Sequence, residues 1–332
     1  MSKSNVLVLL VAMGLSSAAV AQTKKTTAKP AAKPAQAAKP ATSSAPATTA
    51  EKASAEVDEA DQLITNRRLR ASSGSLSKWS AALAFDYSGG AISDPLKPER
   101  PNIIAGAENL TLQNASLSIG ARYRVTTKDS VSLSIGAFMS TPLHDKGARV
   151  SRENKKYFKK NNRDLTIADP GIGYTHLDNF GGWQSVTSTS FTYITNSEQD
   201  NLGYNSSFYF GQTFMRDLGN TGFSYGASVS WTRYFHDKKG DQAKNTLGLF
   251  PAAEYVINDT FNVRTVFGWQ YYGQSRDQAD DDVWVKRKVY QSLGLGISVT
   301  RDIFLYPNIQ FIPSDIRADR TNIAISANIN VF

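Results

Sequence analysis

The sequence predicts an all-β protein: a closed antiparallel transmembrane β-barrel of twelve strands that follows a disordered N-terminal tail. Three observations support this fold class. Segments of alternating apolar and polar residues recur between Lys78 and Phe332, short and long connections alternate between them, and the polar side of most segments consists of small residues. Alternation with a period of two is typical of strands that have one apolar and one polar face.

The first 21 residues have the organisation of a secretory signal peptide. Lys3 provides a positive start, residues 6–15 form a short apolar run, and Ala19-Val20-Ala21 is a small-x-small cleavage site. The apolar run is too short for a spanning helix with these flanks, and a retained membrane anchor is the alternative. The chain contains no cysteine, so an exported protein of this sequence must be stable without disulfides.

Residues 22–62 form a tail rich in alanine, lysine and proline. Its Ala-Lys-Pro units favour extended conformations and cannot bury a core. We expect a solvated periplasmic spacer, and the alternative is an arm whose lysines bind peptidoglycan. The formal net charge of the chain is +8, and residues 22–56 contribute six lysines against two glutamates. Because so much of the charge belongs to this tail, it does not predict a nucleic-acid partner.

A short pre-barrel segment, residues 63–77, connects the tail to the first strand. Residues 57–70 carry acidic residues first and three arginines last, which suits the dipole of a short helix. Leu63, Ile64 and Leu69 would lay this helix on the mouth of the barrel. The alternative is a helix that plugs the lumen.

The number of strands follows from the tight turns. Asp, Asn and Gly residues predict turns at residues 126–130, 178–182, 217–221, 258–260 and 301–302. These five turns join ten strands, and the first and last strands make twelve. Asp169-Pro170-Gly171 interrupts the expected fourth strand, without which the count would be ten. An even count puts both ends of the barrel domain, residues 78–332, on the side of the short turns, which is periplasmic in bacterial barrels.

The two faces of the strands predict a lipid-facing exterior and a polar lumen. The inward positions are mostly Ser and Gly, whereas a soluble barrel would fill its interior with Val, Ile and Leu. A barrel of twelve strands would leave a narrow pore. Three inward arginines against one glutamate favour anions, unless they pair with acidic neighbours such as Asp86 and block the lumen. The larger residues expected to line the lumen are Arg122, Arg124, Glu254, Arg264, Gln270 and Tyr290.

The last twelve residues, TNIAISANINVF, alternate strictly and end on an aromatic residue. Together with the export signal, this segment resembles the terminal assembly signal of Gram-negative outer-membrane β-barrels. The resemblance implies a bacterial outer-membrane location with the tail and the C-terminus in the periplasm, and contact with outer-membrane lipids and the barrel assembly machinery. We predict that Ile329, Val331 and Phe332 form this signal, with Phe332 one residue out of phase. The segment is expected to pair with residues 78–87 and close the barrel.

The function that these observations predict is a passive, narrow porin for small polar solutes. The alternatives are a non-conducting structural or adhesive barrel and an outer-membrane lipid hydrolase. His176 and its neighbours weakly resemble the His-x-Ser-Asn pattern of outer-membrane phospholipase, but Asp178 occupies the place of the serine nucleophile. We therefore expect no catalytic residue, metal or cofactor. A basic outer loop is expected to face lipopolysaccharide phosphates through Lys155, Lys156, Lys159, Lys160 and Arg163.

Overall fold

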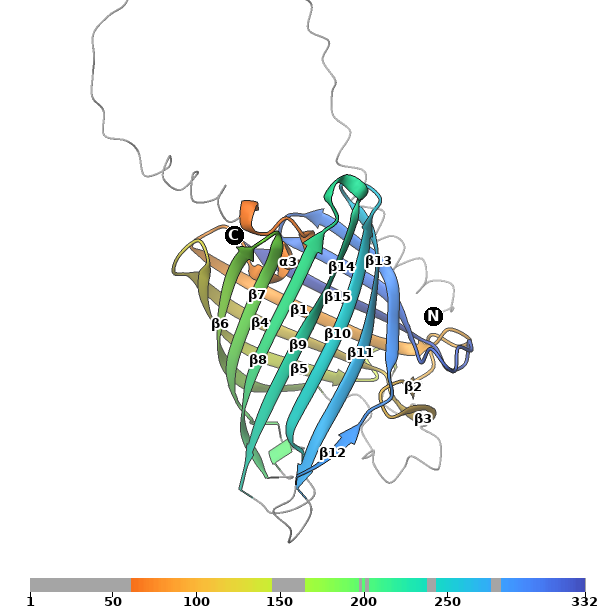
Figure 1. The fold of residues 1–332 in the computed structure, drawn as a ribbon. Coiled ribbons are helices and arrows are strands. Elements are labelled where there is room, and N and C mark those ends of the chain that lie inside the picture. The colour runs from red at the N-terminus through yellow and green to blue at the C-terminus, as the bar shows by residue number, and fades with distance from the viewer. Residues whose placement is uncertain are drawn as a thin grey trace, which may run out of the picture. The chain divides into compact units, whose positions relative to one another are not determined.

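The computed structural model describes residues 61–144, 165–196, 199–200, 203–237, 243–275 and 282–331. Within these residues the chain forms one antiparallel barrel with a short helix, α3 (Arg67–Ser73), at one end (Figure 1). Four of the sequence predictions lie outside the described residues. They are the signal peptide, the tail up to residue 60, the basic loop at residues 155–163, and Phe332.

Twelve strands form a closed ring, as the sequence predicts. Each strand pairs with the next one along the ring, β10 pairs with β11, and β1 pairs with β15, so the sheet has no free edge among these strands. The ring consists of β1 (Trp79–Ala91), β4 (Asn114–Arg124), β5 (Asp129–Ser140), β6 (Leu165–Phe180), β7 (Trp183–Tyr193), β8 (Tyr204–Asp217), β9 (Phe223–His236), β10 (Ala243–Val256), β11 (Phe261–Ser275), β13 (Tyr290–Thr300), β14 (Ile303–Phe311) and β15 (Asn322–Val331).

The first and last strands pair with each other and close the barrel, as the sequence predicts. Ala81 pairs with Val331 and Tyr87 pairs with Ile325, with one irregularity between Ser88 and Ala91. The apolar residues of the terminal segment therefore lie beside the apolar residues of β1. This match puts both sets on one face of the sheet, because side chains of paired residues point the same way.

The five tight turns lie where their residue types predict them. Between β6 and β7, Gly181 and Gly182 have φ values of 58° and 81°. Two consecutive positive φ values are what a two-residue hairpin of type I′ requires, and glycine adopts them without steric cost. Between β10 and β11, the Asn258 side chain accepts hydrogen bonds from the backbone N–H groups of Thr260 and Phe261, both at 2.9 Å.

The interruption at Asp169 is a bulge within a continuous strand. Asp169 has a φ of 61°, and the register between β5 and β6 shifts at this point. Its carboxylate accepts hydrogen bonds from the backbone N–H groups of Thr195 (2.8 Å) and Asn196 (3.1 Å), which holds the bulge in place. The twelve-strand prediction is therefore correct and the ten-strand alternative is wrong.

Two prolines, Pro251 and Pro307, lie within strands of the barrel without shifting the register. The register is the same before and after Pro251 in the pairing of β10 with β11, and before and after Pro307 in the pairing of β13 with β14. Each proline coincides with an interval that lacks recorded pairs in one of its two ladders. The hydrogen-bond ladder is therefore interrupted at each proline, which has no N–H to donate, and resumes in the same register.

The exterior of the barrel is apolar and its interior polar. Leu133, Ile167 and Ile172 are exposed by 62%, 66% and 50% on the outward face. Their strand neighbours on the inward face are Ser132 and Ser134 on β5, and Thr166 and Gly171 on β6. Such an exterior suits contact with lipid tails. Within the described residues, no helix combines the length and apolar character needed to cross a membrane.

The first long connection is more ordered than its Gly- and Pro-rich sequence suggests. It contains a hairpin of β2 (Glu99–Asn102) and β3 (Gly106–Leu112) at the end of the barrel opposite the tight turns (Figure 1). Ile103 and Ala107 pack against Ile312 at the end of β14. A further strand, β12 (Asp282–Lys286), pairs antiparallel with the last residues of β11 at the same end of the barrel.

Candidate functional site

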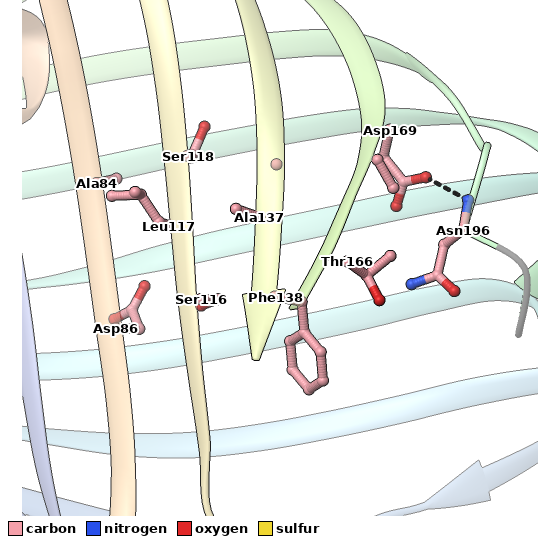
Figure 2. Close-up of a pocket in the computed structure, with 12 residues that line it drawn as sticks. Ala84, Asp86, Ser116, Leu117, Ser118, Ala137, Phe138, Thr166, Asp169 and Asn196 are labelled. Carbon is pink, nitrogen blue, oxygen red and sulfur yellow. Dashed lines mark hydrogen bonds between the residues drawn. The ribbon is translucent and has the colours of Figure 1, made fainter. Parts of the chain in front are cut away.

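The inner wall of the barrel near the long connections carries hydroxyl, amide and carboxylate side chains together with apolar ones such as Ala84, Phe138 and Ala168. A cavity of about 260 Å³ lies against the inner faces of β1, β4, β5 and β6. Figure 2 shows the side chains of Asp86, Ser116, Ser118 and Thr166 around this space. Such a wall offers hydrogen bonds to a passing polar solute and bears one exposed carboxylate, that of Asp86.

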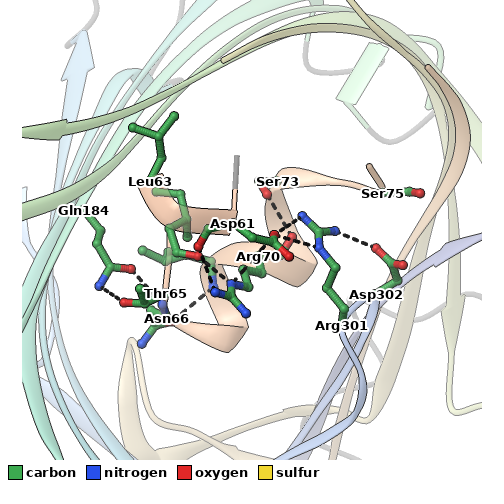
Figure 3. Close-up of polar contacts among 12 residues, drawn as sticks. Asp61, Leu63, Thr65, Asn66, Arg70, Ser73, Ser75, Gln184, Arg301 and Asp302 are labelled. Atoms are coloured by element: carbon green, nitrogen blue, oxygen red, sulfur yellow. Dashed lines mark hydrogen bonds and ion pairs between the residues drawn. The ribbon is translucent and has the colours of Figure 1, made fainter. Parts of the chain in front are cut away.

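The other half of the lumen is occupied by helix α3 and the residues that flank it, which we call the plug (residues 61–77). Figure 3 looks into the ring of strands and shows the helix inside it. Ile64 and Leu69 of the plug are almost fully buried, at 1% and 2% exposure. They pack against three apolar residues on the inner wall, Leu177, Val186 and Met215. Of the two positions that the sequence allows, the plug inside the lumen is correct and the helix on the mouth is wrong.

Local sequence explains why the helix has these limits. Asn66 is the N-cap, and its side-chain oxygen accepts a hydrogen bond from the backbone N–H of Leu69 at 3.1 Å. Gly74 follows the last helical residue with a φ of 98°, a conformation that glycine adopts readily. The Arg70 guanidinium turns back and donates to the carbonyl oxygens of Ile64 and Asp61, at 2.5 and 2.8 Å. The plug is thus a compact unit that its own side chains hold together.

One side of the plug is fixed to β7, β8 and β10 by a polar network around Asn66. The backbone N–H of Asn66 donates to the side-chain oxygen of Gln184 at 2.7 Å (Figure 3). The side-chain amide of Asn66 donates to Glu254 at 2.9 Å. The Gln184 amide donates to Thr65 at 2.6 Å and to Asp217 at 2.9 Å. These bonds connect the N-terminus of the helix to three strands of the wall.

Glu254 is a buried carboxylate with a complete set of partners. It is 3% exposed, and its Oε1 accepts from Nε of Arg264 at 2.8 Å. Its Oε2 accepts from the side-chain amides of Asn66 and Asn262. Glu254 and Arg264 are paired residues of β10 and β11. The pair compensates the burial of both charges, which would otherwise be costly.

The opposite side of the plug is fixed by cations that bind its backbone carbonyls. Arg122 donates to the carbonyl oxygen of Ser72 at 3.3 Å, and Arg124 to that of Ser75 at 2.8 Å. Arg301 donates to the carboxylate of Asp61 at 2.9 Å and to the carbonyl of Gly74 at 3.0 Å (Figure 3). Arg122 and Arg124 therefore hydrogen-bond to the backbone of the plug. The carbonyl of Ala71 accepts from Asn330 of the last strand at 2.6 Å.

The predicted lumen residues separate into two groups. Arg122, Arg124, Glu254 and Arg264 surround the plug near the tight turns. Gln270 and Tyr290 lie toward the long connections. The backbone carbonyl of Gln270 accepts from the N–H of Arg287, and Tyr290 packs against the cluster that contains Ile103. Sequence reasoning missed the residues that position the plug, which are Asn66, Gln184, Asp217, Arg301 and Asn330.

The hydrolase alternative gains no support from the geometry around His176. Its Nδ1 lies 2.7 Å from the carboxylate of Asp129, to which the hydroxyl of Tyr174 also donates. The three groups lie near a tight turn, and the group that His176 contacts is a carboxylate and not a serine hydroxyl. No group of three or more metal-ligating side chains occurs within the part of the chain that the structure describes.

A closed twelve-stranded barrel with an apolar exterior, a polar lumen and an internal plug has the fold of an outer-membrane channel. Among solved structures it is similar to the COG4313 outer membrane channel from Pseudomonas putida F1, at 9% identity and a TM-score of 0.51. The alignment covers 78% of this chain and 97% of that one. The similarity shows the fold.

Two further solved structures are less similar to this chain. The NanC porin has 9% identity and a TM-score of 0.40, with 76% of this chain and 100% of that chain covered. The Salmonella typhi OmpF complex with daunomycin has 10% identity and a TM-score of 0.34, with 76% and 97% covered. No family model matches the sequence, and no curated protein sequence matches it.

Proposed function

We propose that the protein is a passive channel of the bacterial outer membrane, which admits small polar solutes through a lumen narrowed by the plug. The observation that carries the proposal is the contrast between the two halves of the lumen. One half has a hydroxyl-lined wall beside a cavity, and the other is filled by a helix bonded to the wall on two sides. A permeating solute must pass the plug, so the plug sets the size limit.

The proposed orientation places the plug and the C-terminus in the periplasm. Both lie at the end of the barrel with the tight turns, which face the periplasm in bacterial barrels. The preceding tail would then also lie in the periplasm, where peptidoglycan is its proposed partner. The proposed partner of the basic loop is lipopolysaccharide, and that of the terminal strand is the barrel assembly machinery.

Liposome swelling tests passive diffusion directly. The chain without residues 1–21 is reconstituted into liposomes, which are then diluted into isotonic solutions of neutral sugars of increasing size. We expect swelling with a monosaccharide and much slower swelling with a trisaccharide. Heat-modifiable migration on gels verifies that the reconstituted barrel is folded. A folded barrel that admits none of the sugars would overturn the proposal.

The non-conducting structural barrel is the second candidate, and the fixing of the plug on two sides favours it. The two candidates differ in one respect, which is whether the plug leaves a continuous passage. Absence of swelling for the whole chain, followed by swelling once residues 61–77 are deleted, would identify a barrel that the plug seals.

We also propose that conduction favours anions, because two of the three predicted inward arginines keep an uncompensated charge. Arg122 and Arg124 bind carbonyl groups of the plug, and Arg264 is paired with Glu254. The carboxylate of Glu254 compensates the charge of Arg264, whereas carbonyl acceptors leave the charges of Arg122 and Arg124 in place.

A further inference from the structure

The apolar exterior of the barrel is interrupted by polar side chains on β5 to β8, near the tight turns. They are paired across neighbouring strands: Asp129 with His176, His176 with Thr187, and Thr187 with Gln212. Leu133, four residues after Asp129 on β5, is exposed on the outward face. Side chains alternate along a strand and paired residues point the same way, so all four polar side chains point outward.

Hydrogen bonds connect these side chains along the exterior. The hydroxyl of Thr187 donates to the side-chain oxygen of Gln212 at 2.8 Å, and the Gln212 amide donates to the hydroxyl of Ser185 at 2.6 Å. Nδ1 of His176 lies 2.7 Å from the carboxylate of Asp129. We call this group of five the outer polar patch, and its members are Asp129, His176, Ser185, Thr187 and Gln212.

The outer polar patch extends into the apolar band of the barrel. Trp183 and Tyr225, whose rings are 5.4 Å apart, belong to the aromatic girdle near the tight turns. Both are paired with Arg216 of β8, and Gln212 lies four residues before Arg216, which is roughly 13 Å along the strand. The partner of Gln212 on β9 is the apolar Val229. Polar groups at this depth are costly against lipid tails, and they generally face a protein partner.

The patch retains hydrogen-bonding capacity for such a partner. The Gln212 amide has two N–H donors and two acceptor positions, and the bonds within the patch use one of each. Thr187 donates its only hydroxyl hydrogen to Gln212 and keeps its acceptor positions. A surface that both donates and accepts is complementary to a copy of itself, which is what a two-fold interface requires.

The charges on the two flanks of the patch also suit a second copy of the chain. Arg216 on β8 is exposed, and its guanidinium lies 5.8 Å from the centre of the Trp183 ring. It forms no hydrogen bond or ion pair within the part of the chain that the structure describes. Asp178 on β6 has 42% of its side chain exposed, although it is paired with Lys128 at 3.5 Å. A two-fold axis through β7 exchanges β6 and β8, and therefore brings Arg216 of one copy toward Asp178 of the other.

A hollow of about 540 Å³ adjoins the patch on the same exterior face. It lies between the aromatic rings of Phe180, Trp183, Phe214 and Tyr225. The small residue Ala227, which is paired with Phe214, leaves this space open. An apolar side chain of a second copy can fill the hollow while the polar groups beside it meet their counterparts.

We propose that the outer polar patch is an interface between two copies of this chain, related by a two-fold axis along the membrane normal. The contact combines hydrogen bonds at the patch, the charge pair of Arg216 with Asp178, and the aromatic hollow. The proposal does not rest on the channel function, because two barrels associate through their exterior whether or not their lumens conduct.

Disulfide crosslinking in the membrane tests the interface. The chain contains no cysteine, so a single introduced cysteine reports its own surroundings. Thr187→Cys lies beside the proposed axis, and the matched control is Leu293→Cys, at a 41% exposed position of β13 on the far side of the ring. After oxidation with copper phenanthroline, we expect disulfide-linked dimers of the Thr187 variant and not of the Leu293 variant. Equal yields from the two variants would overturn the interface.

Sedimentation equilibrium in detergent distinguishes a second copy from a lipid as the partner of the patch. We expect the parent chain to form dimers, and Gln212→Leu to raise the dimer dissociation constant roughly threefold to tenfold, as is typical of a side-chain hydrogen bond between membrane-spanning segments. Heat-modifiable migration on gels verifies that both proteins are folded. A folded parent chain that sediments as a monomer would refute the proposal and leave the patch to polar lipids.

A charge exchange tests the two-fold arrangement. Arg216→Asp places like charges opposite each other and should weaken the dimer. Adding Asp178→Arg to the same chain restores opposite charges across the axis and should recover dimerisation. Equal dissociation constants for the parent, the single variant and the double variant would contradict the arrangement.

Discussion

Replacing Asn66 with alanine is expected to release the plug from the barrel wall. The substitution removes the N-cap bond to Leu69 and the amide bond to the buried carboxylate of Glu254, at 3.1 and 2.9 Å. An N-cap contributes about 1 kcal/mol and a hydrogen bond to a charged group about 2 kcal/mol. A loss of about 3 kcal/mol lowers the docking equilibrium constant roughly a hundredfold. The backbone bond from Asn66 to Gln184 remains, so the barrel itself should fold.

Asn66→Asp separates the two contributions. Aspartate is as good an N-cap as asparagine, but its carboxylate would face Glu254 in place of an N–H donor. We therefore expect Asn66→Asp to loosen the plug at least as much as Asn66→Ala. The matched control is Asn205→Ala, which removes an amide bond to Asp237 at 2.9 Å on an exposed part of the long-connection end.

Trypsin cleavage of the folded, reconstituted barrel measures docking. The plug contains Arg67, Arg68 and Arg70, and a docked plug should resist cleavage after them, because proteolysis follows the population of the opened state. Both Asn66 variants should be cleaved much faster than the parent, and Asn205→Ala at the parental rate. If the Asn66 variants are cleaved as slowly as the parent while gel migration shows folded barrels, the docking network has been misassigned.

Three further predictions concern packing, charge and closure. Leu69→Ala should weaken docking of the plug by about 2–5 kcal/mol, because the side chain fills a cluster with Leu177, Val186 and Met215. Faster trypsin cleavage of the plug would show this loss, and Leu110→Ala, at an exposed position of β3, is the control. Unchanged cleavage of the Leu69 variant would contradict the prediction. Glu254→Gln should lower the midpoint of urea unfolding, because it leaves the buried Arg264 without a countercharge. The control is Asp259→Asn, which removes an exposed ion pair with Arg67 and should leave the midpoint unchanged. Equal midpoints for both variants would show that the buried pair does not stabilise the barrel. Deleting Val331 and Phe332 removes the pair between Val331 and Ala81. The deletion should reduce the heat-modifiable, folded fraction in the outer membrane, while the signal peptide is still removed. Full assembly of the truncated chain would argue against the terminal segment as the assembly signal.

Local patterns in the sequence are sufficient to predict the barrel. The alternation in residues 321–332 sets the face and the register of the last strand, because a shift by one residue would turn its isoleucines toward the lumen. The glycines at 181 and 182 predict a hairpin for a reason that involves only their own backbone. The bulge at Asp169 is harder to foresee, since it depends on the N–H groups of Thr195 and Asn196, which are distant in sequence.

The position of the plug depends on information that no single segment contains. A helix on the mouth of the barrel and a helix inside the lumen would both bury Leu63, Ile64 and Leu69. The deciding residues are Leu177, Val186 and Met215, which are apolar at positions of three strands that face the lumen. Apolar residues on an otherwise small and polar inner face are the signal that predicts an internal partner.

The candidate site was predicted only in part, for a related reason. The alternation identifies Arg122, Arg124 and Arg264 as inward-facing residues, but it does not show what meets them. Their partners come from the plug and from Glu254.

Single-channel conductance, with and without the plug, measures whether the barrel is a channel that the plug narrows. The chain without residues 1–21 is recorded in planar bilayers beside the same chain that also lacks residues 61–77, after gel migration has shown that both are folded. We expect small, uniform conductance steps for the chain with the plug and steps several times larger for the chain without it. Equal conductance in the two proteins would contradict a plug that narrows the lumen, and absence of steps in both would contradict a channel.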